Sequence, residues 1–135
     1  MTFNAATLPR TLLTINATIL CSTPFIADWN HTHIYNPRWP PHAKFHNGQT
    51  MSMAVCLSFL SLYYTWAPSA NADENDALNV AAVIGGTYWI TGLSAILYPG
   101  SKAIDPEFAD GFPEFPQFWP WVGLLGMCAW AWWLA

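Results

Sequence analysis

Apolar residues along this chain gather into four long runs that contain no charged side chain. The runs cover residues 11–27, 45–72, 77–101 and 115–135. Each run can hold a helix of about 17–25 residues, and at a rise of 1.5 Å per residue such a helix crosses the ~30 Å hydrocarbon core of a bilayer. We therefore predict an all-α fold: a polytopic membrane protein with a single four-transmembrane-helix domain over residues 1–135 and spans at about 8–27, 49–66, 77–98 and 118–135.

Aromatic and small residues within the runs are typical of membrane helices. Tryptophan and tyrosine cluster near the predicted helix ends, at Trp66, Tyr98 and Trp119 among others, as an interfacial aromatic belt requires. The third run contains Ala81-x-x-x-Gly85 and Ala82-x-x-x-Gly86. This spacing of small residues lets helix backbones approach closely in lipid, so it favours a compact bundle.

Composition changes the picture by excluding partners. Charged residues make up 9% of the chain, against roughly a quarter in soluble domains, while hydrophobic residues reach 53%. The four Lys and Arg residues are scattered singly and the net charge is −4, so no basic surface for nucleic acid is expected. Three cysteines, far apart in apolar runs, do not form a disulfide or zinc pattern. The expected partners are the lipid bilayer and a lipophilic small molecule, with the oligomeric state left open.

Four spans place the connection between the first two helices and the connection between the last two on one side of the membrane. Arg38, Lys44 and Lys102 lie in these connections, and Arg10 lies on the other side. The positive-inside rule then predicts that both connections are cytoplasmic in a multi-pass protein of the endoplasmic reticulum membrane. A cleaved signal peptide over the first run is the alternative, but no small-residue cleavage site follows it and the apolar run continues to Asp28.

The first of these connections is unusually rich in groups that transfer protons. It holds all four histidines of the chain, three prolines and two tryptophans within about twenty residues. From Pro41 onward His42, His46 and Gln49 fall at helical positions i, i+4 and i+7, which predicts that they share one helix face at the mouth of the bundle. Asp28, at the end of the first run, lies at the same depth.

The connection between the third and fourth helices brings carboxylates to the same mouth. A partly desolvated carboxyl group has a raised pKa and can act as a general acid, whereas a carboxylate held by hydrogen bonds can act as a base. The possible general acids are Asp105, Glu107 and Glu114. The alternative is an ordinary hydrated loop whose charges solvate the end of the bundle.

The histidine spacings His31-x-His33 and His42-x-x-x-His46 raise the question of a metal. The boxes of membrane di-iron enzymes use about twice as many histidines as the four present here. We expect no metal and no cofactor, although a single divalent ion held by His42, His46 and an acid stays open as an alternative.

A longer string around these residues resembles a known group of proteins. Asp28-Trp29-Asn30-x-Thr32-His33-x-Tyr35-Asn36-Pro37-Arg38-Trp39-Pro40-Pro41-His42-Ala43-Lys44-Phe45-His46 is similar to the signature of small fungal four-helix membrane proteins found with secondary-metabolite pathways. The resemblance extends over the whole chain in length and layout. It implies kinship with the integral-membrane epoxide hydrolases and cyclases of polyene-pyrone pathways of the aurovertin, asteltoxin and citreoviridin type.

Together these observations predict a membrane enzyme that opens epoxides of a lipophilic polyketide or polyene by acid–base catalysis without a cofactor. Asp28 would activate water or a substrate hydroxyl, Asn30 and His33 would orient it, His42, His46 or a protonated acid would donate a proton, and Arg38 would stabilise the alkoxide. The expected substrate-binding residues are Trp29, Asn36, Trp39, Gln49, Tyr98 and Trp119. The alternatives are a proton-initiated membrane terpenoid or meroterpenoid cyclase, a double-bond isomerase, and a non-catalytic accessory membrane protein.

Overall fold

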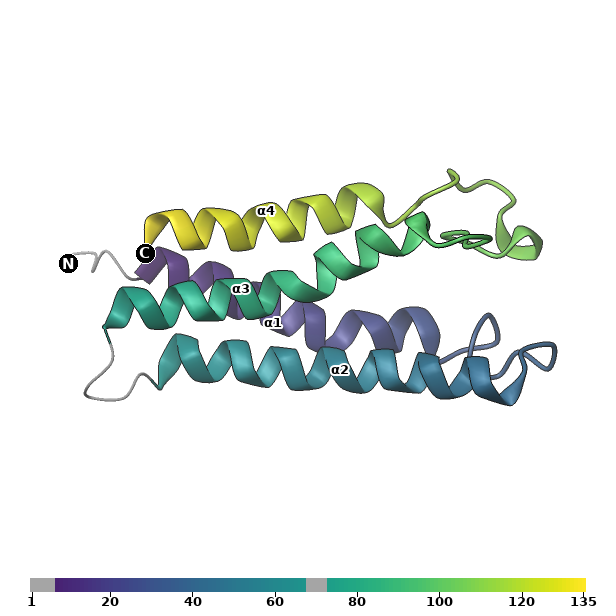
Figure 1. The fold of residues 1–135 in the computed structure, drawn as a ribbon, viewed down its shortest axis with the longest axis horizontal. Coiled ribbons are helices and arrows are strands. Elements are labelled where there is room, and N and C mark those ends of the chain that lie inside the picture. The colour runs from purple at the N-terminus through teal and green to yellow at the C-terminus, as the bar shows by residue number, and fades with distance from the viewer. Residues whose placement is uncertain (1–6, 68–72) are drawn as a thin grey trace.

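The computed structural model describes residues 7–67 and 73–135, and within these ranges the chain is helical, with no strand. Four helices run up and down beside one another: α1 (Thr7–Asp28), α2 (Pro41–Trp66), α3 (Glu74–Ser94) and α4 (Phe118–Leu134) (Figure 1). Two short 3₁₀ helices follow α3: η1 (Ala95–Leu97) and η2 (Pro106–Phe108). The prediction of an all-α fold with four long helices is confirmed.

The helix boundaries follow local signals in the sequence. Helices α1 and α4 lie within one residue of the predicted 8–27 and 118–135. Helix α2 begins at Pro41, ahead of the predicted 49, because extended Pro40 precedes a proline that is preorganised for the first helical position. Asp73 caps α3 by accepting a hydrogen bond from the backbone N–H of Asn75 at 2.8 Å.

The helices pack as a four-cornered bundle in chain order. Within the described residues, each helix contacts its sequence neighbours, α1 also contacts α4 and α3, and α2 makes no contact with α4. The connections 29–40 and 95–117 therefore lie together at one end of the bundle, while the start of α1 and the end of α4 lie at the other (Figure 1). Two loops far apart in sequence thus share one end.

Small residues let the helices approach near the middle and toward the end where α1 begins. Ala81, Ala82 and Ala131 pack with Leu13 and Leu78 in one buried cluster. A Cβ added at Gly85 would lie 3.2 Å from the side-chain oxygen of Asn16 and 3.3 Å from Ser61 Oγ, closer than ordinary contact distance. The small-residue spacing on α3 therefore serves close helix packing, as predicted.

A layer of buried polar groups crosses the centre of the bundle. Asn16, which is 1% exposed, donates to the backbone carbonyl of Leu124 at 3.1 Å and accepts from Trp89 Nε1 at 3.3 Å. Ser61 donates to the carbonyl of Ala81 at 3.0 Å. These bonds tie α1 to α3 and α4, and α2 to α3, with the hydrogen-bonding needs of both side chains met inside the bundle.

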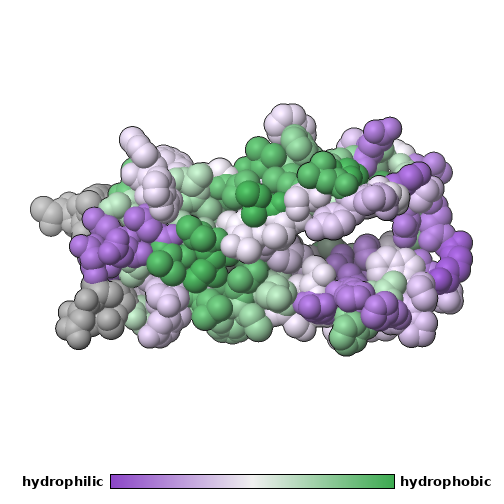
Figure 2. Space-filling view, in the orientation of Figure 1, coloured by the Kyte–Doolittle hydropathy of each residue, from purple (hydrophilic) through white to green (hydrophobic). Residues whose placement is uncertain are grey.

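The outside of the bundle is largely apolar. A hydrophobic band covers the middle of the face in Figure 2, between hydrophilic ends, and exposed large residues include Phe59, Val83, Ile90 and Trp133. Two of the described helical segments are long and apolar enough to cross a membrane: Thr7–Asp28, with mean hydropathy 1.2, and Glu74–Leu97, with mean hydropathy 1.6. In each, 28% of the apolar window is buried inside the protein, so most of it faces outward.

The other two helices fall short of that standard for identifiable reasons. Helix α4 has 17 residues, about 25 Å at 1.5 Å per residue against the ~30 Å core of a bilayer. Helix α2 has 26 residues, but its first turns carry Lys44, two histidines and two amides, and serines, threonines and two tyrosines interrupt the apolar part that follows. The described residues 7–67 and 73–135 therefore contain four long helices, two of which are candidate membrane spans.

Candidate functional site

A cavity of about 300 Å³ opens inside the bundle near the two long connections. All four long helices contribute to it, and Figure 2 shows the surface hollowed at this end. Its walls are formed by Thr23, Pro24, Ala27, Asp28, His33, Thr50, Tyr88, Trp89, Gly92, Ala95, Ile96, Ser101, Lys102, Ala103, Phe115, Gln117 and Trp121. Apolar and aromatic walls with a few polar groups are typical of small-molecule sites.

Asp28 is the carboxylate that lines this cavity. It ends α1, and its side chain is 18% exposed. One oxygen accepts a hydrogen bond from Asn47 Nδ2 at 2.8 Å, and the other lies 3.7 Å from His33 Nε2. Asn47 therefore holds one oxygen of the carboxylate in place and leaves the other on the side of His33.

A short hydrogen-bond chain behind His33 fixes which of its nitrogens carries a proton. The side-chain amide of Asn30 donates to the carbonyl of Ala27 at 2.7 Å, so its oxygen faces Thr32 and accepts the Thr32 hydroxyl at 2.6 Å. Having donated, Thr32 Oγ1 can only accept from His33 Nδ1, 2.7 Å away. His33 Nε2 is then left facing Asp28. Asn30 is thus linked through Thr32 to His33, which lies beside Asp28.

The opposite wall is built by α3 and the connection to α4. Tyr88 contributes a phenol, and Lys102 contributes an ammonium group that forms no ion pair within the described residues. Gln117, just before α4, donates to the carbonyl of Ala103 at 2.9 Å. The cavity therefore has a carboxylate and an imidazole on one side and proton donors on the other.

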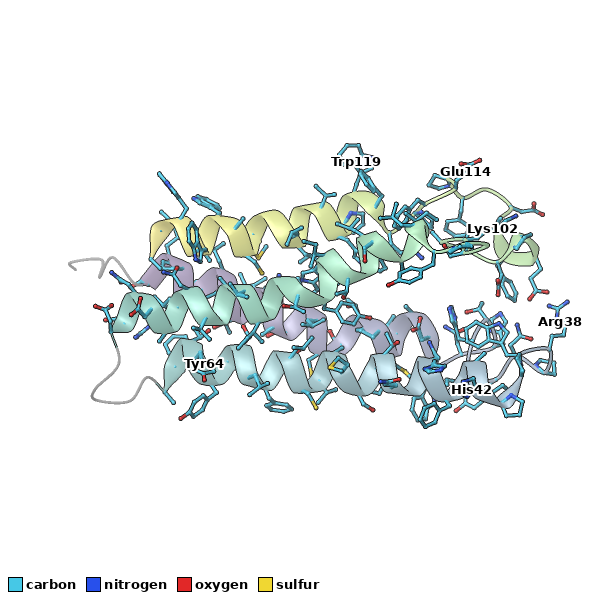
Figure 3. The ribbon with its side chains drawn as sticks, in the orientation of Figure 1. Arg38, His42, Tyr64, Lys102, Glu114 and Trp119 are labelled. Carbon is cyan, nitrogen blue, oxygen red and sulfur yellow. The ribbon has the colours of Figure 1, made fainter. Side chains whose placement is uncertain are left out.

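The two long connections are tied together beyond the cavity. Asn36, which is 1% exposed, donates to Glu107 at 3.3 Å and accepts from the backbone N–H of Arg38 at 2.9 Å. Arg38 forms an ion pair with Glu107 at the tip of the bundle (Figure 3). Trp39 donates to Asp105 at 3.3 Å, and its ring packs edge-on against His33 at 4.8 Å between centroids. The contacts join the two connections beyond the cavity. The residues of the connections that make them do not line the cavity: Asn36, Arg38, Trp39, Asp105 and Glu107.

His42 and His46 come together on the exposed start of α2. Their Nε2 atoms are 3.1 Å apart, and His46 Nδ1 is 3.2 Å from the side-chain oxygen of Gln49. This pattern is satisfied when His46 is protonated on Nδ1 and His42 on Nε2, with both rings neutral. The predicted shared face exists, but none of the three side chains lines the cavity. In the part of the chain that the structure describes, no three His, Cys, Asp or Glu residues form a group that could hold a metal ion.

Four other predicted residues lie on the outer surface. Trp119 is 76% exposed and points away from the bundle, and Glu114 lies on the outer connection (Figure 3). Tyr98 is 69% exposed, and Trp29 is 52% exposed, donating to the hydroxyl of Tyr35 at 2.6 Å. The aromatic rings around the cavity come instead from Tyr88, Trp89, Phe115 and Trp121.

The sequence reasoning missed Tyr88, Asn47, Gln117 and Trp121. Tyr88 lies in an apolar run, where a tyrosine is typical of packing, and Asn47 and Gln117 belong to no recognisable motif. The alternation of Trp119 and Trp121 held a usable signal. Two residues apart on a helix are about 200° apart around its axis, so only one of these rings can face inward, and the structure turns Trp121 toward the cavity.

The fold and site define a class: a small helical bundle whose apolar interior opens at one end onto a carboxylate, an imidazole and an ammonium group. Residues 12–131 match DUF6640, a family of unknown function, and the chain belongs to that family. No curated protein and no solved structure matches the chain.

Proposed function

We propose that all four helices cross a membrane, that of the endoplasmic reticulum, with the connections 29–40 and 95–117 on the cytoplasmic side. The exposed apolar band and the low burial of the two candidate spans support this topology. Each helix would contribute its outward apolar face to lipid, and the polar first turns of α2 would lie at the interface.

Thiol labelling of sealed microsomes tests the topology. Cys21, Cys56 and Cys128 are first replaced by alanine, and one cysteine is then introduced by Asp110→Cys or by Asp76→Cys. Both positions are exposed and lie at opposite ends of the bundle. An impermeant maleimide should label the Asp110→Cys variant in intact vesicles and the Asp76→Cys variant only after permeabilisation. Equal labelling of both in intact vesicles would refute a spanning bundle, and the reverse order would refute the orientation.

We propose further that the cavity opens an epoxide on a lipophilic polyketide or polyene, the class implied by the sequence resemblance. The observation that carries this proposal is the pairing of Asp28 with His33 at the mouth of a cavity whose other wall holds Tyr88 and Lys102. Epoxide opening needs a base for the nucleophile and an acid for the departing oxygen, and both kinds of group line one space.

In the proposed reaction Asp28 removes a proton from water, or from a hydroxyl of the substrate, as that oxygen attacks an epoxide carbon. The carbon–oxygen bond of the epoxide breaks, and its electron pair goes to the epoxide oxygen. Tyr88 donates its proton to this alkoxide beside the positive charge of Lys102. The proton taken up by Asp28 then returns to the phenolate through His33 or solvent, so that the sum is addition of water, or closure of a ring by the internal hydroxyl.

The test uses the purified full chain in lipid nanodiscs with 1,2-epoxydecane as the probe and water labelled with ¹⁸O. We expect the diol to form with one labelled oxygen, at a rate unchanged by EDTA. Tyr88→Phe should lower the rate by about 10²-fold, in the range of general-acid catalysis. Formation of an unlabelled isomer would instead support the isomerase alternative. No turnover above protein-free nanodiscs, with this probe and with hydroxylated polyene epoxides, would refute the proposal.

A further inference from the structure

His42 and His46 form a pair of imidazole rings on the exposed start of α2, outside the cavity (Figure 3). Residues four apart on a helix lie one above the other on the same face. The Nε2 atoms of the two rings are 3.1 Å apart, and both side chains are exposed to solvent. The two nitrogens therefore face each other at a place that an ion in solution can reach.

The distance between these two nitrogens is the one that a transition-metal ion requires. Zn²⁺ binds histidine nitrogen at about 2.0–2.1 Å, so two such nitrogens at angles of about 90–109° around one ion lie about 2.8–3.4 Å apart. The observed 3.1 Å falls within this range. Two histidines at i and i+4 of one helix also supply zinc ligands in the H-E-x-x-H motif. An ion can therefore take the place of the proton between the two rings with little movement of either.

Neighbouring groups orient the two rings. His46 Nδ1 lies 3.2 Å from the side-chain oxygen of Gln49, so it can donate there and leave Nε2 free as a ligand. The ring of Phe45 lies parallel to that of His42 at 6.0 Å between centroids and edge-on to that of His46 at 5.5 Å. The carbonyl of Pro40 accepts the first backbone hydrogen bonds of α2, so the turn that carries His42 is already formed. An ion would thus meet ligands that are held in place.

The ligand set determines which ions fit. Imidazole nitrogen suits Cu²⁺, Ni²⁺ and Zn²⁺, whereas Mg²⁺ and Ca²⁺ prefer oxygen ligands. Because no group of three His, Cys, Asp or Glu residues forms within residues 7–67 and 73–135, the other coordination positions are left to water. Structural zinc sites have four protein ligands, and catalytic zinc sites have three. The pair therefore fits an exchangeable ion at the surface.

We propose that His42 and His46 form a surface binding site for one late first-row transition-metal ion, with Cu²⁺ held more tightly than Zn²⁺ according to the Irving–Williams order. Neither residue lines the cavity, so the site is separate from the epoxide chemistry proposed above, which should proceed in EDTA. The metal site and the epoxide reaction can therefore be tested, and can fail, independently.

Binding of ZnCl₂ to the untagged full chain in dodecyl maltoside micelles, followed by titration calorimetry, tests the site. His42→Ala and His46→Ala each remove one ligand. His31→Ala is the matched control, because His31 is also exposed and does not belong to the pair. We expect one ion per unmodified chain and a loss of affinity of about tenfold or more in each pair variant, since loss of an outer-shell partner alone costs about 10–100-fold. His31→Ala should bind like the unmodified chain, and MgCl₂ should give no heat of binding.

Electron paramagnetic resonance with Cu²⁺ gives a readout on the unmodified chain, so it does not depend on the folding of a variant. Two imidazole ligands should split the copper signal by coupling to two nitrogens, and His46→Ala should leave coupling to one at most. Equal loss of Zn²⁺ affinity in His31→Ala and in the pair variants would overturn the proposal. Unchanged affinity in both pair variants, or a copper spectrum of the unmodified chain without coupling to two nitrogens, would overturn it as well.

Discussion

At the end of the bundle where α1 begins, the helices close on one another, and at the other end they stand apart around a cavity. The closed end has an ion pair between Arg10 and Glu74 at 2.8 Å, and the guanidinium lies 5.4 Å from the centre of the Trp66 ring. Trp66 in turn donates to Thr14 at 2.9 Å. At the open end, hydrogen bonds run between the connections and leave the space beneath them unfilled.

The difference lies in where each end places its polar groups. At the closed end an ion pair and the hydrogen bond of Trp66 run between helices, beside a cluster of alanines and leucines. At the open end polar residues that include Asp28, His33 and Lys102 line the cavity. The closed end and the proposed site thus lie at opposite ends of the same four helices, with the Asn16 layer between them. Substitutions can therefore affect one end and spare the other.

The largest effect should come from Asp28→Asn. The amide keeps the shape of the side chain and cannot accept a proton as a carboxylate does, so epoxide turnover should fall about 10²–10⁴-fold. Helical content and thermal unfolding, followed by circular dichroism, should stay close to those of the unmodified chain. Asp110→Asn is the matched control, because Asp110 is an exposed carboxylate on the connection before α4. Equal turnover by Asp28→Asn and Asp110→Asn would contradict the role of Asp28.

Gly92→Ala should damage the open end by filling it. A Cβ at this position would lie 2.7 Å from Trp121 Cζ3, so the indole ring must move within a cavity that both residues line. Overpacking of this kind destabilises by about 1–3 kcal/mol, and we expect binding of 1-decanol, a lipophilic probe of the cavity added to the full chain in lipid nanodiscs, to weaken about tenfold as well. Titration calorimetry and denaturant unfolding measure the two effects.

Gly126→Ala is the control for that substitution. It lies on α4, and no atom stands within 4 Å of an added Cβ. Alanine favours a helix over glycine by up to about 1 kcal/mol, so stability should be unchanged or slightly raised and binding unaffected. Loss of binding in both variants would show that the cavity does not depend on the contact between Gly92 and Trp121.

Asn16→Leu should weaken the layer that separates the two ends. It leaves the indole N–H of Trp89 buried without its acceptor, and Trp89 is 1% exposed. An unpaired buried donor costs about 1–3 kcal/mol, to be measured as the change in unfolding free energy. In a Trp89→Phe background the same substitution should cost less, because the donor is gone. An equal cost in both backgrounds would argue against this hydrogen bond as the cause.

The smallest effect should come from the closed end. Glu74 is 45% exposed, so its pairing with Arg10 is screened by solvent. A double-mutant cycle with Arg10→Ala and Glu74→Ala should give a coupling energy of about 0.2–1 kcal/mol in unfolding, falling in high salt. Epoxide turnover should not change in any of the three variants. A loss of turnover comparable to that of Asp28→Asn would remove the distinction between the ends.

The fold was largely predictable because uncharged runs define helices directly. Helix α1 ends at the charge of Asp28, α4 begins two residues after Pro116, and the start of α2 was marked by Pro40 and Pro41. Hydrophobicity alone predicted that the second helix begins at 49, because the first turns of α2 are polar although they are already helical. Whether the second and fourth helices cross a membrane depends on lipid contacts that residue order does not contain.

The candidate site was predictable in composition and less so in geometry. The grouping of Asp28, Asn30 and His33 follows from their closeness in sequence, since a few turn residues fix their relative positions. The outward orientation of His42 and His46 could not be predicted, because a shared helix face can point inward or outward. Only packing against the other helices decides between the two orientations. For the same reason Trp119 was predicted as a wall of the cavity, whereas Trp121 lies there in the structure.

The hydrogen bonds between residues far apart in sequence also determine the order in which parts of the molecule can form during synthesis. Asn36 and Glu107 are 71 positions apart, and Asn16 and Leu124 are 108 apart. On a ribosome the chain emerges from its N-terminal side, so the pair of Arg10 with Glu74 can form once α3 has been made. The hydrogen bonds between the two connections require the segment before α4, and the central layer around Asn16 requires α4 itself. The pair of Arg10 with Glu74 is thus available early in synthesis, whereas the proposed site and the packing of Ala131 at the closed end both wait for α4.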